Sequence, residues 1–171
     1  MKCTFSKKDK ASYNAAKAQW GPSSSNNNQT PIYEAHTKYA IDVTNYEDLY
    51  KDADVVIVGA IGKLIDTEYY NVSYKETQKG KVLVGSPLSK YVVQDCYCLK
   101  GDYIPDYVYQ IGGIAMNQEY YVLKEGDRML EEGVTYLLFG YIQNDGKLII
   151  SGMNSSTKVK DLNDAQALLS K

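Results

Sequence analysis

The chain has 171 residues, of which 44% are hydrophobic and 23% are charged. This is the balance of a globular protein whose core needs no metal or disulfide to hold it together. The 19 basic and 21 acidic residues give a formal net charge of -2, so there is no general attraction to nucleic acid or to anionic membranes. We therefore expect no nucleic-acid partner. No run of 18 apolar residues predicts a membrane-spanning helix.

Tyrosine is unusually frequent, with 17 Tyr against 2 Phe and 1 Trp. Its ring packs well on the pleated surface of a strand, and its hydroxyl tolerates half-exposed positions. One interpretation is therefore a sheet surface rich in tyrosine. The other is a binding face for a sugar, a peptide or a protein.

The first part of the chain differs in composition from the rest. Residues 8–20 are rich in Ala and Lys and predict a short helix, which Gly21 and Pro22 would end. The segment from Ser23 to Pro31 is polar and predicts a flexible linker. Helix and linker together would act as a spacer that holds a folded domain away from a surface.

A short helix and a buried strand are predicted after the linker. Thr44 is expected to cap the first turn, with Glu47 three residues later as in a capping box, and the helix would run to about Lys51. Residues 55–62 are too uniformly apolar for a strand with one wet face, so we expect a central strand buried on both sides. Its two glycines would allow the sharp bend that closes a small barrel.

The remaining chain predicts a series of strands separated by turns. The segments expected to be extended are residues 64–74, 82–84, 90–99, 107–111, 134–142 and 147–151. The turns are expected at residues 77–81, 85–87, 100–102 and 144–146. The last hairpin is the clearest, because its Asn-Asp-Gly turn accepts positive φ. Residues 119–130 are ambiguous, and residues 157–171 are polar and then weakly helical.

The order of these segments resembles a known fold family. The segments that carry the resemblance are ADVVIVGAIGKL at residues 53–64, YVVQDCYCLKGD at residues 91–102 and GVTYLLFGYIQNDGKLIIS at residues 133–151. They resemble the netrin-like variant of the OB fold, which occurs in the tissue inhibitors of metalloproteinases and in bacterial secreted or surface-anchored proteins. The resemblance covers residues 45–151. It implies an all-β domain with short helices, built as a five-stranded OB-like closed or partly open barrel.

Together, the composition and the resemblance divide the chain into three parts. They are an N-terminal helix and linker (residues 1–31), an OB-like β-barrel domain (residues 32–160) and a C-terminal tail (residues 161–171). The resemblance implies an extracellular or cell-surface setting and speaks to fold more than to chemistry. We favour a non-enzymatic, monomeric binding module for an unknown protein or carbohydrate. A lipid anchor at Cys3 would tether it to a membrane.

Protease inhibition is the alternative function that the netrin-like resemblance implies. In the metalloproteinase inhibitors, a disulfide-held N-terminal cysteine offers its amino group and carbonyl to the zinc of the protease. Here Cys3 follows Met1 and Lys2, and a linker separates it from the expected barrel. The binding module therefore remains the favoured interpretation.

Few residues suggest catalytic or metal chemistry. Cys96 and Cys98 share one face of a strand, where they would act as small buried hydrophobes, form a disulfide or contribute to a metal or redox site. His36 is the only histidine and is expected on the surface, and Glu131 and Glu132 are expected to be loop charges. No nucleotide, protease or calcium motif is present. We therefore expect no catalytic residue, no metal and no cofactor.

Tyrosines on the second and third barrel strands form the candidate ligand site. OB barrels often bind oligonucleotides or oligosaccharides on this face. The candidate residues are Tyr91, Tyr97, Tyr107 and Tyr109. The spacing of Tyr107 and Tyr109 places them on one face. Such a face suits carbohydrate or protein, because binding of single-stranded nucleic acid would also need a positive groove.

Overall fold

The computed structural model describes residues 30–170, apart from residues 37, 79 and 117–119. The strands are β1 (Ile32–Ala35), β2 (Val55–Thr77), β3 (Gly80–Lys100), β4 (Tyr107–Ile114), β5 (Tyr121–Lys124), β6 (Thr135–Ile142), β7 (Leu148–Ile150) and β8 (Ser156–Lys158), and the helices are α2 (Tyr46–Asp52) and α3 (Leu162–Leu169). Neither of these helices is long and apolar enough to cross a bilayer. The predicted helix at residues 8–20 and the linker before Thr30 lie outside the described residues.

The strands form one sheet that closes on itself. Their hydrogen-bonded order is β1-β5-β4-β3-β2-β6-β7, with β8 beside β6. A parallel pairing of β4 with β7, through Tyr109 with Ile149 and Gln110 with Ile150, closes β2, β3, β4, β7 and β6 into a ring of five strands. The predicted mostly-β class is therefore confirmed. Outside the ring, β1 pairs in parallel with β5.

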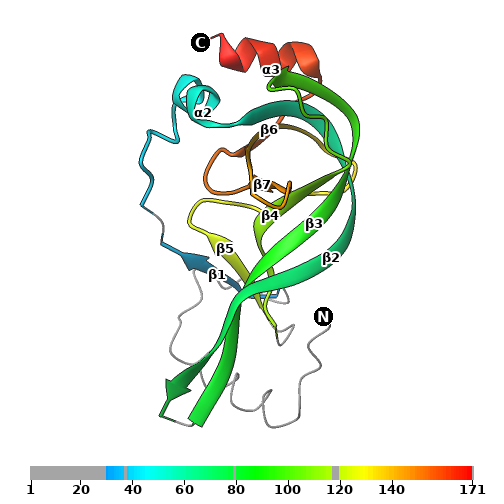
Figure 1. The fold of residues 1–171 in the computed structure, drawn as a ribbon. Helices are drawn as coiled ribbons and strands as arrows, with labels where there is room; N and C mark the ends of the chain where they lie inside the picture. Colours follow the sequence, from blue (N-terminus) through cyan, green and yellow to red (C-terminus); the bar gives the residue numbers. More distant parts are fainter. Residues whose placement is uncertain (1–29, 37, 79, 117–119, 171) are drawn as a thin grey trace.

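The β2–β3 hairpin is the longest feature of the fold. Figure 1 shows its tip beyond the ring, at the end of the molecule opposite α2 and α3. The predicted break at residues 85–87 is wrong, because β3 is continuous from Gly80 to Lys100. Pairing of β3 with β4 begins only at Leu88, so Pro87 lies where β3 pairs with β2 alone, and proline is tolerated at such an edge.

The first part of β2, residues 55–62, is buried on both faces because it separates two hydrophobic clusters. Val55 and Ile57 belong to a cluster inside the ring, which receives side chains from all five ring strands. Val56 and Val58 alternate with them and belong to a second cluster, which also contains side chains of α2 and α3. Two apolar faces explain why residues 55–62 are almost continuously hydrophobic, as the sequence predicts.

The start of α2 differs from the prediction. Its N-cap is Asn45, whose side chain accepts a hydrogen bond from the backbone N–H of Glu47. The predicted cap, Thr44, instead donates its hydroxyl to Asp42 Oδ1 at 2.6 Å. The expected capping box is therefore wrong, and Glu47 forms an ion pair with Lys51 one turn later. At the other end of the chain, α3 confirms the weak helical signal.

Candidate functional site

The structure separates the four tyrosines of the predicted site. Tyr107 and Tyr109 lie on the outer face of the ring, and Tyr107 is 40% exposed. Tyr91 lies in the core with 3% of the residue exposed, because its register partner is the buried Val108. Tyr97 is exposed, but it lines a different pocket with residues at the start of α3. Of the four predicted residues, Tyr107 and Tyr109 therefore lie together, and Tyr91 and Tyr97 lie elsewhere.

The two adjacent tyrosines and two lysines form what we call the Tyr–Lys face: Lys90, Tyr107, Tyr109 and Lys147. Lys90 is the cross-strand partner of Tyr109. Its Nζ lies 4.0 Å from the ring centre of Tyr107 and 5.7 Å from that of Tyr109. Lys147 Nζ lies 5.4 Å from the ring centre of Tyr109. Both ammonium groups are thus within range of cation–π attraction to the rings.

Lys147 also ties the β6–β7 turn to the base of the long hairpin. Its ammonium forms ion pairs with Glu68 Oε2 at 3.1 Å and with Asp145 Oδ2 at 3.2 Å. Hydrogen bonds to Glu68 and Asp145 raise the pKa of Lys147, and a hydrogen bond from the backbone N–H of Lys147 lowers the pKa of Asp145. Lys147 and Asp145 therefore keep their charges at neutral pH and offer a ligand fixed polar contacts.

A pocket of about 400 Å³ adjoins the Tyr–Lys face. Apolar residues and polar residues of the β6–β7 turn line it together: Tyr70, Leu88, Ile111, Gln143, Asn144, Asp145, Lys147 and Ile149. A further tyrosine, Tyr103, donates a hydrogen bond to the carbonyl of Gly146 in the same turn at 3.4 Å. Aromatic surface, amides and fixed charges in one place can bind a polar ligand that has flat apolar faces.

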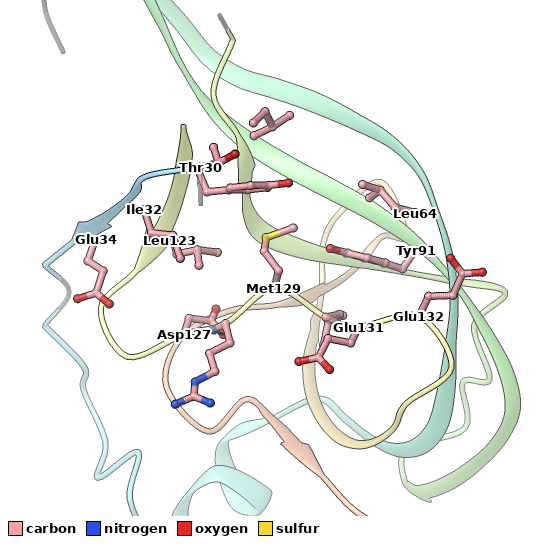
Figure 2. Close-up of a pocket in the computed structure, with 14 residues that line it drawn as sticks. Thr30, Ile32, Glu34, Leu64, Tyr91, Leu123, Asp127, Met129, Glu131 and Glu132 are labelled. Carbon is pink, nitrogen blue, oxygen red and sulfur yellow. Dashed lines mark hydrogen bonds between the residues drawn. The ribbon is translucent and has the colours of Figure 1, made fainter. Parts of the chain in front are cut away.

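A second, larger cavity has a volume of about 760 Å³ (Figure 2). Tyr91, the predicted site residue that lies in the core, is part of its lining. Residues 127–132 and strands β1 and β5 form much of its wall. Sequence reasoning missed this cavity, because residues 119–130 show no clear period. In the structure, this ambiguous segment contains β5 and the start of a loop that leads to β6.

One carboxylate of the larger cavity, Asp127, is buried, and both of its oxygens accept hydrogen bonds. Its Oδ1 accepts from the backbone N–H of Arg128 at 2.8 Å and from Gln110 Nε2 at 3.3 Å. Its Oδ2 accepts from the backbone N–H of Gly152 at 3.2 Å. Burial raises the pKa of Asp127 to about 6, against the lowering effect of these hydrogen bonds. Gln110 further accepts from the backbone N–H of Leu130, so the network fixes the loop.

Of the other residues that the sequence singles out, Glu131 and Glu132 line the larger cavity, whereas Cys96, Cys98 and His36 lie outside the linings of both cavities. Cys96 and Cys98 are free thiols, partly buried against the cluster inside the ring, as expected for small hydrophobes. Burial raises the pKa of Cys96 to about 11, with a smaller contribution from Cys98. His36 is exposed, and its Nδ1 lies 2.9 Å from Glu125 Oε2. Within the described part of the chain, no group of three or more His, Cys, Asp or Glu side chains could hold a metal ion.

No protein-family model, no curated protein and no solved structure matches this chain. The netrin-like resemblance of the sequence therefore stays a prediction.

Proposed function

We propose that the domain is a non-enzymatic binding module outside the cell, and that its ligand contacts the Tyr–Lys face. The observation that carries this proposal is the position of Tyr107 and Tyr109 beside an amide-lined pocket. Exposed tyrosines supply a large contact area at a small entropic cost, because binding fixes only two side-chain torsions. The netrin-like resemblance supports the setting outside the cell.

The fold that we propose for this module is an OB-type barrel, with the five ring strands as its strands. In OB folds, ligands bind over the second and third strands, between the loops that follow the first and fourth strands. Here those strands are β3 and β4, and those loops are the β2–β3 hairpin and the β6–β7 turn. Lys90 lies on β3, Tyr107 and Tyr109 lie on β4, and Lys147 lies at the end of the β6–β7 turn. This agreement supports the proposed barrel and the proposed ligand site.

A carbohydrate is the ligand class that fits the site best. The rings of Tyr107 and Tyr109 can pack on the apolar faces of a sugar when the side chain of Lys90 moves aside. The side-chain amides of Gln143 and Asn144 and the carboxylate of Asp145 can exchange hydrogen bonds with sugar hydroxyls. The volume of about 400 Å³ is at the small end of ligand sites, which suits the end of a sugar chain.

A glycan array probed with the full chain tests this proposal, followed by affinity measurements in solution. Tyr107→Ala and Tyr109→Ala should each weaken glycan binding about 10-fold or more, because each removes one ring of the Tyr–Lys face. Tyr97→Ala is the matched control, since Tyr97 is 57% exposed and lies outside the face. An equal loss in this control would contradict the site, and binding to a protein but to no glycan would contradict the ligand class. Chemical conversion of a bound glycan would contradict the non-enzymatic function.

Protease inhibition remains the alternative prediction from the resemblance. No contact among residues 30–170, as far as these are described, favours it. The Cys3 on which it depends lies outside them.

A further inference from the structure

The cavity in Figure 2 is separate from the Tyr–Lys face and shares no lining residue with it. Its volume of about 760 Å³ is within the usual range of about 300–1,000 Å³ for small-molecule sites. Residues of β1 and β5, of β2 and β3, and of the loop between β5 and β6 contribute to its wall. The cavity therefore lies where the parallel β1–β5 pair meets the ring.

Most of the wall is apolar. Leu64 comes from β2, Leu123 from β5 and Met129 from the loop, as Figure 2 shows. Leu64 is 41% exposed although it is a large aliphatic side chain, so part of the apolar surface is open to solvent. The unbranched thioether of methionine adapts its shape to what it contacts. Such a wall favours a ligand with an apolar body.

A hydroxyl on the cavity wall has no hydrogen-bond partner among the residues that the structure describes. Tyr91 is 3% exposed, and its hydroxyl bonds to no described residue. Figure 2 shows the hydroxyl end pointing toward Met129, which also lines the cavity. Burial raises the pKa of Tyr91, so the hydroxyl is neutral at physiological pH. The hydroxyl is therefore available to exchange a hydrogen bond with a polar atom of a ligand in the cavity.

The cavity is also strongly acidic. Its lining contains four carboxylates and one guanidinium, that of Arg128. Glu131 is paired with Lys158 at 2.7 Å. Glu34 and Glu132 form no ion pair with any residue that the structure describes. Two exposed carboxylates, Glu34 of β1 and Glu132 of the loop, therefore remain on opposite sides of the cavity, and either can receive a cationic group.

From the apolar wall, the unpaired hydroxyl and the acidic lining together, we infer that this cavity binds a small amphiphilic amine. The apolar body fills the space against Leu64 and Met129, the Tyr91 hydroxyl pairs with a polar atom, and the ammonium group lies near Glu34 or Glu132, which Figure 2 shows on opposite sides of the cavity. A carboxylate-bearing amphiphile such as a fatty acid would meet like charges, which disfavour it. This inference is independent of the proposed function, because it concerns a different set of residues.

Three probes with the same apolar chain test the inference: hexylammonium, hexan-1-ol and hexanoate. Each is titrated into the full chain while NMR follows the backbone amide signals of β5 and the loop. Hexylammonium should bind about 10-fold or more tightly than hexanoate, with hexan-1-ol between them. The double variant Glu34→Gln with Glu132→Gln should weaken hexylammonium about 3- to 10-fold and leave hexan-1-ol unchanged. Glu76→Gln, an exposed carboxylate on the hairpin, should change neither affinity.

A second variant tests the cavity without relying on charge. Leu64→Trp adds bulk from a partly exposed position, so the fold should persist, as the dispersion of the amide signals will show, while all three probes lose affinity. The inference would be overturned by equal affinities for hexylammonium and hexanoate, by no binding of any probe, or by unchanged binding in the folded Leu64→Trp variant. The glycan test uses different variants, so either conclusion can fail alone.

Discussion

At the residue scale, Asp127 should make the stability of the protein depend on pH. Burial raises its pKa to about 6, from the ordinary value of 3.8 that applies in the unfolded chain. The folded state therefore binds this proton more tightly than the unfolded state. Its contribution to stability is fully present below about pH 4 and is lost as the pH rises through 6. A shift of about two units corresponds to roughly 3 kcal/mol.

The variant Asp127→Asn should lack this dependence, because an amide does not titrate. Urea unfolding at pH 4 and at pH 7 is the measurement. Over this interval the wild type should lose about 2–3 kcal/mol of unfolding free energy relative to the variant. Glu76→Gln changes an exposed carboxylate and should follow the wild type. Parallel profiles for wild type and Asp127→Asn would show that the buried carboxylate has an ordinary pKa.

At the element scale, the side chain of Lys100 from β3 caps the C-terminus of α2. Lys100 Nζ donates to the carbonyls of Tyr50 at 2.7 Å, Lys51 at 2.9 Å and Ala53 at 2.6 Å. Carbonyls at a helix C-terminus lack intrahelical donors and carry partial negative charge, so an ammonium is favourable there. Gly101 follows with φ of 88°, where glycine is favoured. The Lys-Gly pair that contributes to the netrin-like resemblance thus has a structural role.

Lys100→Met should lower the free energy of unfolding by about 2–3 kcal/mol. The substitution keeps the aliphatic chain and leaves three carbonyls without a charged donor. Lys63→Met is the control, because Lys63 is an exposed lysine on β2 and its loss should matter by less than about 0.5 kcal/mol. Chemical denaturation of both variants gives the comparison. Equal stabilities would mean that water replaces the Lys100 ammonium without loss.

Elements with strong local signals could be predicted from the sequence. The hairpin of β6 and β7 is one, because its turn residues dictate the connection. The strands β1 and β8 could not, since three or four residues show no period and their places depend on pairing with β5 and β6. The cap of α2 is a similar case. Thr44 and Asn45 are both suitable caps, and only the three-dimensional path of the chain selects Asn45.

The candidate site was predictable only where alternation along a single strand decides it. Tyr107 and Tyr109 share a face by period 2. The face of Tyr91 depends on its register with Val108 of another strand, which no local pattern reveals. Tyr97 lies beyond an irregularity in which β3 has one more residue than β2, marked by a φ of 48° at Asp95. Because of the extra residue, the side chains after it, including that of Tyr97, point to the opposite face of the sheet from the one that regular alternation predicts.

At the scale of the whole molecule, β2 and β6 couple the two hydrophobic clusters. Along β6, Leu138 faces the cluster inside the ring, while Leu137 and Phe139 face the cluster under the helices. All three side chains are fully buried. Neither cluster can lose its packing without exposing one face of these two strands. The domain should therefore unfold in a single cooperative transition.

This coupling makes α3 part of the stability of the whole domain, although its composition suggests a tail. Ala165 is fully buried, and Leu162, Leu168 and Leu169 pack against the cluster under the helices. Ending the chain at Lys160 exposes that cluster and should lower the free energy of unfolding by about 3–5 kcal/mol, since burying one leucine contributes about 1.5–3 kcal/mol.

Urea unfolding, followed both by tyrosine fluorescence and by far-ultraviolet circular dichroism, measures the effect of this truncation. Both signals should shift together to lower urea, because loss of the outer cluster destabilises the ring through β2 and β6. Gln166→Ala changes an exposed residue of α3 and should leave the transition in place. If the truncated chain keeps the wild-type midpoint, α3 lies on the domain without stabilising it. If the two signals separate, the clusters are independent, and β2 and β6 do not transmit stability between them.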